Sequence, residues 1–373
     1  MKLRSVLPVL LFCSIAGALS AQSSPTWHDP SPHKIQFVAV DKDVKLEVLD
    51  WGGAGRALVL LAGGGDTAHV YDDFAPKLTS QYHVYGITRR GFGASSAPIP
   101  DEHNYSADRL GDDVLGVLDA LKLDRPVLVG HSLAGEELSS IGSRRPERVA
   151  GLIYLEAAYQ YAYYDRSQGF LPIDMRELKA DLAEVNPANV GQKRELVQKM
   201  IQEDLPEFER DLKTMQTSYA VPQALPPPIP TATDTASLAA FREWQVHIQG
   251  FTSPEAEIRE HYEIEPDGSV GKRHNPPPAF QAMLDQMQKY TGLRVPILAI
   301  YADPLDWGAY KSAKDRDAAD AANKAWVEGQ ARALQAGVPS ARVVMLAKTN
   351  HAIFLSNEAD VLREMRQFLA GLP

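Results

Sequence analysis

The segment that most constrains the fold of this chain is Gly130-His131-Ser132-Leu133-Ala134-Gly135. The apolar run Pro126–Val129 before it predicts a short buried strand, and Ala134–Arg145 predicts a helix after it. A serine in so tight a strand-to-helix turn needs small neighbours two positions away on each side, and Gly130 and Ala134 meet that demand. The start of the helix also favours developing negative charge. The pattern is typical of a nucleophilic serine presented at the edge of a parallel sheet.

Short apolar runs alternate with helical patterns on both sides of this turn. Such alternation predicts a mostly parallel sheet with helices on both faces. The expected strands are Lys34–Val40, Val44–Asp50, Ala57–Leu61, Tyr82–Thr88, Pro126–Val129, Val149–Leu155, Pro296–Tyr301 and Arg342–Leu346. The expected helices are one capped by Ser106, then Ala134–Arg145, Ala318–Ala336 closed by Gly337, and Asn357–Leu369.

The alternation is interrupted in the middle of the chain. Helix-forming residues dominate Met175–Lys213, with breaks expected at Pro187 and Pro206, and Pro222–Pro230 cannot form a regular helix. A hairpin is expected at Glu263–Lys272, around an Asp-Gly turn. We interpret this stretch as an inserted, mainly helical cap. The expected division is a signal peptide at residues 1–21, a core at 34–157 and 292–373, and the cap at 158–291.

The first residues have the order of a secretory signal peptide. Lys2 and Arg4 supply positive charge, Val6–Ala18 is mostly apolar, and Ser20 and Ala21 are small enough for cleavage. The apolar run is too short to span a membrane comfortably. We therefore expect a secreted or periplasmic protein with no stable membrane anchor after cleavage.

Composition narrows the classes of function. Cys13 is the only cysteine, so cleavage would leave no residue for a disulfide, a thiol nucleophile or a thiolate–metal site. The formal net charge of −10 argues against nucleic acid and anionic membranes as partners. The sequence has no H-E-x-x-H pattern. We expect a small-molecule substrate and neither a metal nor a cofactor, and the oligomeric state is not indicated.

A serine hydroxyl is a weak nucleophile unless a base takes its proton. His351 is the candidate base, because it lies between the last expected strand, Arg342–Leu346, and the last helix. His131 stands beside the nucleophile and is expected to pack there and support the turn.

A carboxylate must hold the base in its working tautomer and stabilise its cation. Asp303 and Asp306 follow the strand Pro296–Tyr301, where the order Ser, acid, His places an acid. Glu156 follows the strand Val149–Leu155 and is the second possible position. The sequence leaves the choice open, with Asp306 and Glu156 ahead of Asp303.

Two backbone N–H groups must stabilise the oxyanion that forms during acyl transfer. One is expected from Leu133, directly after the nucleophile. The other is expected from Gly64, with Gly63 or Gly65 as alternatives, because glycine lets the backbone approach closely.

These segments together resemble the α/β-hydrolase superfamily, in its capped branch of esterase-like members. The likeness covers about Lys34–Leu155 and Val295–Leu369. It is carried by Gly63-Gly64-Gly65, Arg90-Gly91-Phe92-Gly93, the segment 130–135 and His351. The resemblance implies an eight-stranded, mostly parallel sheet with a cap inserted after the sixth strand.

The chain departs from the family pattern at three places. Ala62 stands where members commonly have histidine. Leu305 occupies the place where many members carry the acid, so Asp306 would need a loop one residue longer. Glu156 is similar to the acid position of some haloalkane dehalogenases. Those enzymes and epoxide hydrolases use an aspartate nucleophile, where this chain has Ser132.

The expected reaction is acyl transfer to water through an ester on Ser132, with a small to medium carboxylic ester as substrate. An amide or peptide substrate, as in proline iminopeptidases, is the first alternative. A hydrolase-fold binding protein without turnover is the second. The candidate lining residues under the cap are Tyr159, Tyr161, Tyr163, Tyr164 and Trp307.

Overall fold

The computed structural model describes residues 27–185, 191, 193–347 and 349–373. The chain divides into two compact units, Met1–Pro30 and Ser31–Pro373, and everything below concerns the second. The expected signal peptide, with Cys13, lies outside the described residues, as does Pro187. Secretion therefore stays a prediction. Across the described residues, no helix has both the length and the apolar character to cross a bilayer.

The second unit is built on an eight-stranded sheet in the order β1-β2-β4-β3-β5-β6-β9-β10. Strand β2 pairs antiparallel with β1 and β4, and the other neighbours are parallel. The predicted fold class is confirmed. The strands are β1 Lys34–Asp41, β2 Val44–Gly52, β3 Ala57–Leu61, β4 His83–Ile87, β5 Val127–His131, β6 Gly151–Leu155, β9 Ile297–Ala302 and β10 Arg342–Leu346.

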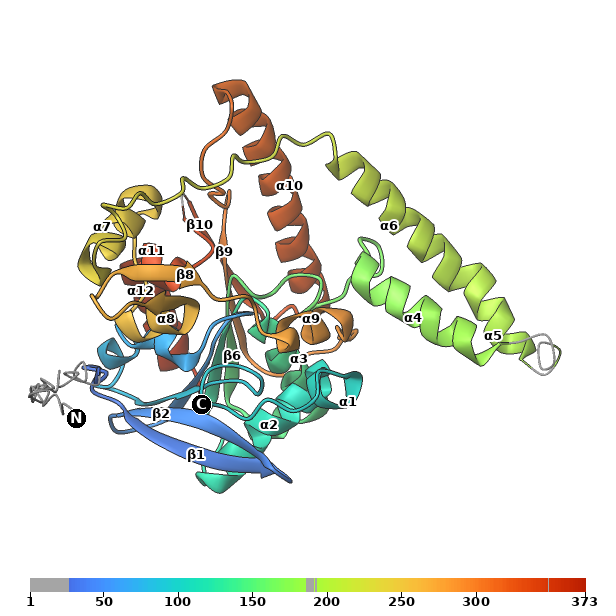
Figure 1. Ribbon diagram of the computed structural model, residues 1–373. Coiled ribbons are helices and arrows are strands. Elements are labelled where there is room, and N and C mark those ends of the chain that lie inside the picture. The colour runs from blue at the N-terminus through green and yellow to red at the C-terminus, as the bar shows by residue number, and fades with distance from the viewer. Residues whose placement is uncertain (1–26, 186–190, 192, 348) are drawn as a thin grey trace, which may run out of the picture. The chain divides into compact units, whose positions relative to one another are not determined.

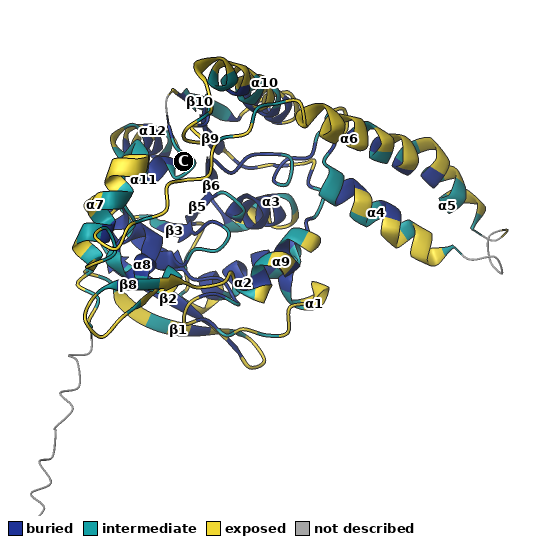
Figure 2. Cartoon of the chain, turned by 45° about the horizontal axis from the view of Figure 1, so that its top comes forward, coloured by how far each residue is buried: buried dark blue, intermediate teal, exposed yellow. Residues whose placement is uncertain are grey.

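The central strands are apolar throughout because both faces of the sheet are covered. Alternate residues of β3 point to opposite faces, so Val59 and Leu61 join one cluster while Leu58 and Leu60 join the other. The first cluster packs under α2 (Ala107–Ala120), α3 (Ala134–Arg144) and α10 (Ala313–Gly337). The second packs under the short turns η1 (Ala68–Tyr71) and η2 (Ala75–Lys77) and under α12 (Glu358–Ala370). Figure 1 shows this layering, and Figure 2 shows the buried strands within it.

The helix ends follow the expected capping with one exception. The Ser106 hydroxyl accepts a hydrogen bond from Arg109 N at the start of α2, as predicted. Gly337 does not close α10 but is its last residue. A Cβ at Gly337 would lie 1.4 Å from the Tyr163 hydroxyl oxygen, so this glycine makes room for a neighbouring ring.

The segment between β6 and β9 is mainly helical. Its helices α4 and α6 contact each other and extend away from the sheet in Figures 1 and 2. Pro206 does not end a helix: it lies in the first turn of α6, after a π-helical turn at Met200–Asp204. Proline suits that position because the first helical N–H groups need no partner within the helix. The elements are α4 Leu171–Glu184, α5 Arg194–Lys199, α6 Leu205–Ser218, α7 Leu238–Gln249, α8 Glu255–His261, β7 Tyr262–Ile264, β8 Val270–Arg273 and α9 Pro278–Asp285.

The irregular course expected for Pro222–Pro230 and the expected hairpin are both present, the latter as β7 and β8. The boundaries given above for a cap, residues 158–291, remain a prediction. We call this segment the cap from here on.

Candidate active site

Ser132 lies in a strained turn between β5 and α3. Its φ of +50° is in the left-handed region, which non-glycine residues seldom adopt. The turn is tightly packed: a Cβ at Gly130 would lie 2.9 Å from a methyl carbon of Leu138 and 3.1 Å from Cβ of Ala134. The strand, turn and helix that a nucleophile elbow requires are therefore all present.

His351 lies between β10 and the short helix α11 (Ile353–Ser356). Its Nδ1 is 3.2 Å from Oε2 of Glu156. The His351 side chain is 39% exposed, whereas that of Glu156 is fully buried. The contact occupies Nδ1 and leaves Nε2 for a second partner, which is the geometry that a triad base requires.

Glu156 is held in place from several sides. It directly follows β6, with a left-handed φ of +51° that turns the chain out of the sheet. Its Oε1 accepts hydrogen bonds from the Tyr159 hydroxyl at 2.8 Å and from Ala302 N at 2.5 Å. A buried carboxylate with three such contacts is fixed in one orientation and charge-stabilised by them.

The two aspartates after β9 point to other partners. The Asp306 carboxylate accepts from Gly308 N at 2.9 Å, faces Arg316 at 3.7 Å and is more than half exposed. Asp303 pairs with Lys324 at 2.7 Å. The structure thus brings Glu156 to His351, whereas Asp306 orders its own loop and Asp303 ties that loop to α10.

The glycine-rich loop after β3 approaches the nucleophile closely. A Cβ at Gly63 would lie 3.3 Å from Cβ of Ser132, and one at Gly64 would lie 2.5 Å from Cδ1 of Leu133 and 2.6 Å from Phe280. The loop therefore needs glycine at both positions to pack against the elbow. Gly64 thus lies against the side chain of Leu133, next to Ser132 in the chain, and the role of their two N–H groups as oxyanion donors stays a prediction.

His131 ties the elbow to the loop of His351. Its Nε2 donates a hydrogen bond to the backbone oxygen of His351 at 3.0 Å, and the two rings lie 4.8 Å apart. Burial, reinforced by nearby His351, lowers the pKa of His131 to about 3. His131 is therefore neutral at ordinary pH, and it supports the site in the way the sequence indicated.

One of the five candidate lining residues is joined to the proposed site by a hydrogen bond. Tyr159 is buried, donates to Glu156 and stacks on Trp326 with ring centroids 4.7 Å apart. The ring of Tyr161 packs beside those of Tyr159 and Phe170, with centroids 6.1 Å and 6.4 Å away. The sequence signal for Tyr159 is only its place shortly after an expected strand.

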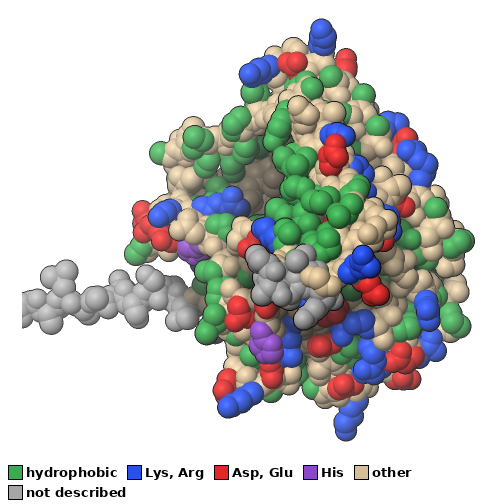
Figure 3. Space-filling view, turned by 90° about the vertical axis from the view of Figure 1, so that its right-hand side faces the viewer, with side chains coloured by type: hydrophobic (Ala, Val, Ile, Leu, Met, Phe, Trp, Pro, Cys, Tyr) green, Lys and Arg blue, Asp and Glu red, His purple; other side chains and the backbone are tan. Residues whose placement is uncertain are grey.

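The other three candidates lie elsewhere. Tyr163 packs beside Gly337, and the Tyr164 hydroxyl donates to Asp174 at 2.7 Å. Trp307 is 56% exposed and lines a different hollow with Trp326. Figure 3 shows hydrophobic side chains gathered beside a hollow on the side that carries α4 and α6.

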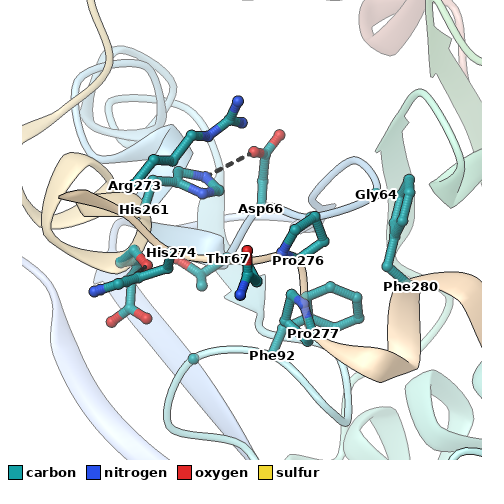
Figure 4. Close-up of a pocket in the computed structure, with 14 residues that line it drawn as sticks. Gly64, Asp66, Thr67, Phe92, His261, Arg273, His274, Pro276, Pro277 and Phe280 are labelled. Atoms are coloured by element: carbon teal, nitrogen blue, oxygen red, sulfur yellow. Dashed lines mark hydrogen bonds and ion pairs between the residues drawn. The ribbon is translucent and has the colours of Figure 1, made fainter. Parts of the chain in front are cut away.

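A cavity of about 440 Å³ lies between the glycine-rich loop and the cap. His261 is the centre of its charged wall, with Nε2 3.2 Å from Asp66 (Figure 4). The same atom lies 3.0 Å from Glu257. The hydrogen bonds to these carboxylates, that to Asp66 first, raise the pKa of His261 to about 10. Asp66, Glu257 and His261 place ligand atoms within 4.8 Å of one another, as a metal would need. Nε2 of His261 is, however, already in contact with both carboxylates. Arg273 adds a second cation to the same wall.

Comparison with known families gives one match over most of the chain. The family described as "alpha/beta hydrolase fold" matches residues 56–358. This range begins just before β3 and ends at the start of α12, so it includes the elbow and the His351 loop.

Curated relatives match over a shorter stretch. A fluoroacetate dehalogenase from a Burkholderia species is 32% identical over 122 residues, which are 32% of this chain and 40% of that protein. A 2-hydroxymuconate semialdehyde hydrolase from a Pseudomonas species is 32% identical over 109 residues, 28% of this chain and 38% of that protein. The chain thus spans about two fifths of the length of these relatives.

Solved structures align along most of the chain at low identity. An E-2-(acetamidomethylene)succinate hydrolase covers 91% of this chain and all of its own, with a TM-score of 0.54 and 16% identity. An enol-lactonase from Burkholderia xenovorans covers 90% of this chain and all of its own, with a TM-score of 0.51 and 17% identity. These similarities show the shared fold.

Proposed function

Because the chain belongs to the α/β-hydrolase fold family and is a hydrolase, we propose that it cleaves small to medium carboxylic esters through an acyl-enzyme on Ser132. The observation that carries the proposal is the contact of Glu156 with Nδ1 of His351, beside a serine held at a φ of +50°. Glu156 is then the acid of the triad. A carboxylate with only a structural role would have no reason to contact His351, the one histidine that follows the last strand.

The reaction follows from this arrangement. The Ser132 hydroxyl attacks the ester carbonyl while Nε2 of His351 takes its proton, and Glu156 stabilises the resulting imidazolium. The N–H groups of Gly64 and Leu133 stabilise the oxyanion. The C–O bond to the alcohol breaks as His351 returns the proton to the leaving oxygen. His351 then activates water, which releases the acid and regenerates Ser132.

The reaction named for the fluoroacetate dehalogenase does not transfer to this chain. Opening a carbon–halogen bond or an epoxide through an enzyme-bound ester requires a carboxylate nucleophile. Ser132 occupies the nucleophile position here. Acyl transfer is the chemistry that a serine with a histidine base supports.

The charges of the 440 Å³ cavity do not choose between an ester and an aminoacyl amide. A substrate amine would need an uncompensated carboxylate. Asp66 contacts the protonated His261, but Glu260 lines the cavity as well as Arg273. The proline iminopeptidase type of activity stays the second candidate, and a comparison of substrates decides between the two.

Labelling with a fluorophosphonate probe tests whether Ser132 is an activated nucleophile. We expect the folded wild type to label and Ser132→Ala to remain unlabelled. A folded wild type that does not label would contradict the enzyme proposal and favour a binding protein. Hydrolysis of a chain-length series of nitrophenyl esters beside an aminoacyl amide series then separates esterase from amidase.

A matched pair of substitutions tests the assignment of the acid. Glu156→Gln keeps the shape but removes the charge that orients His351, so kcat should fall about 10³- to 10⁴-fold. Asp306→Asn removes only an exposed loop contact, and kcat should stay within about threefold of wild type. A severe loss in Asp306→Asn, or mild losses in both, would contradict Glu156 as the acid.

A further inference from the structure

A second group of titratable side chains lies at the start of β1, outside the residues assigned to the reaction. Nδ1 of His33 is 2.8 Å from Oδ1 of Asp72, and Nδ1 of His69 is 3.0 Å from Oδ2 of the same carboxylate. His33 directly precedes β1, whereas His69 lies in the turn η1 and Asp72 ends that turn. One carboxylate thus joins two histidines from separate segments, and His33 and Asp72 are 39 residues apart in the chain.

The group is buried, so its charges need compensation. The side chains of His33, Asp72 and His69 are 2%, 4% and 9% exposed. Glu47 adds a second carboxylate, 5% exposed, with Oε1 3.7 Å from Nε2 of His69. With both imidazoles neutral, the two buried carboxylates carry two negative charges, which a divalent cation would balance. Burial lowers the pKa of His69, but hydrogen bonds to Asp72 and Glu47 outweigh burial and raise that pKa to about 10, so a cation bound here displaces a proton.

Two imidazoles and a carboxylate are a donor set that Zn²⁺ binds readily. Tetrahedral bonds of about 2.0–2.1 Å place neighbouring ligand atoms about 3.3 Å apart. The contacts of Asp72 with His33 and His69, at 2.8 and 3.0 Å, therefore need to open only slightly to admit the ion. The ligand atoms of these three side chains all lie within 4.8 Å of one another.

The surrounding contacts orient the ligands in the way that metal sites require. A metal-bound histidine usually presents its second ring nitrogen to a carboxylate or a carbonyl oxygen. His69 directs Nδ1 to Asp72 and Nε2 to Glu47, and Glu47 in turn accepts a hydrogen bond from the Thr88 hydroxyl at 2.7 Å. The Ser31 hydroxyl donates to Oδ1 of Asp72 at 2.8 Å. Each donor atom of η1 is thus held by a partner outside the ligand set.

We propose that His33, His69 and Asp72 form a binding site for a divalent cation of the zinc class, with solvent as the fourth ligand. Glu47 orients His69 and is not itself a ligand. The ion ties the segment before β1 to η1, so its role is to stabilise the fold. This inference goes beyond ester hydrolysis and does not depend on it. It departs from the expectation of no metal, because ligands so distant in the chain form no sequence motif.

Zinc binding to the untagged full chain tests the proposal. After a chelator has removed bound metal, calorimetric titration at pH 8 should show one Zn²⁺ per chain. Co²⁺ in place of Zn²⁺ should give the visible absorption of a tetrahedral ion. Zinc at 100-fold above its Kd should raise the thermal midpoint by about 2–5 °C, because the assembled site exists only in the folded chain.

Substitutions locate the site. His33→Gln and His69→Gln each remove one ligand and should weaken zinc binding at least about 100-fold, whereas Glu47→Gln removes only the outer partner and should weaken it about 10- to 100-fold. His83→Gln is the matched control, because His83 pairs with Asp50 at 2.8 Å outside this group, and it should bind zinc like wild type. Circular dichroism checks that each variant is folded, and His33→Gln alone carries the test if His69→Gln does not fold.

Three results would overturn the assignment. Zinc binding that persists in both His33→Gln and His69→Gln would exclude this group. Binding that is lost in His261→Gln instead would place the ion on Asp66, Glu257 and His261 in the cavity wall. A wild type that binds no zinc below millimolar concentration would refute the site outright. Fluorophosphonate labelling is unaffected by any of these results, so the proposed hydrolase function is judged separately.

Discussion

Acid should destabilise this protein through one buried histidine. His131 is 4% exposed, and its pKa is lowered from 6.5 to about 3. In the unfolded chain His131 therefore takes up a proton near pH 6.5, whereas in the folded chain it does so only near pH 3. The stability that neutral His131 provides is complete above pH 6.5 and is lost as the pH falls toward 3. Linkage gives a loss of about 2 kcal/mol of unfolding free energy between pH 7 and pH 5.

Other histidines act in the opposite sense, so the effect must be isolated by difference. Carboxylates raise the pKa of His69 and of His261 to about 10, so both add stability as the pH falls below 7. The variant His131→Gln cannot titrate, and its amide nitrogen can replace Nε2 as the donor to His351. Urea unfolding of wild type and variant at pH 7, 6 and 5 should give curves that converge by about 2 kcal/mol toward pH 5.

A direct titration checks the same reasoning without a variant. The ring signals of His131 in an NMR experiment should stay in their neutral form down to about pH 4. Stability curves of wild type and His131→Gln that run parallel, or a ring titration with a midpoint near 6.5, would refute the account. Either result would mean that water or a counter-charge reaches Nδ1 of His131.

Three further perturbations have clear expected outcomes. Arg90 is fully buried against Asp113, so Arg90→Met should cost about 3–5 kcal/mol in urea unfolding, and adding Asp113→Leu should recover most of it. Gly135→Ala places a Cβ against the backbone oxygen of Ala157, which should lower the free energy of unfolding by about 1–3 kcal/mol. The displaced loop should also reduce the proposed esterase activity, and an unchanged stability and activity would contradict this contact. The pKa of His261 is raised to about 10, so the stability that its protonated form contributes is complete below pH 6.5 and is lost as the pH rises through 10. The thermal unfolding temperature of His261→Gln should therefore depend less on pH between about 7 and 10.5 than that of wild type.

The sheet was predictable because its signals are local. A strand buried on both faces is a short apolar run, and the expected strand Ala57–Leu61 matches the observed β3 residue for residue. The expected strand Arg342–Leu346 matches β10 equally well, although β10 lies at the edge of the sheet and is only partly buried. The elbow was equally visible, since its small residues are neighbours in the chain. Helical segments of the cap were harder to place, because their ends depend on packing between helices, as the π-helical turn before Pro206 illustrates.

The acid could not be chosen from the sequence. Asp306 and Glu156 both follow strands whose ends meet at the same edge of the sheet. What separates them is the left-handed turn at Glu156, the hydrogen bond from nearby Tyr159, and the contacts of Glu156 with Ala302 and His351, which lie far away in the chain.

The loop from Glu156 to Ala162 also limits how freely the cap can be exchanged. An insertion that begins after the last residue of a catalytic site can be replaced as a module. Here the first residue beyond β6 is Glu156, which contacts Nδ1 of His351, and Tyr159 three residues later donates a hydrogen bond to Glu156. A chimera that takes its cap from another hydrolase must therefore be joined after Ala162, because a graft made at the end of β6 would exchange the proposed acid together with the cap.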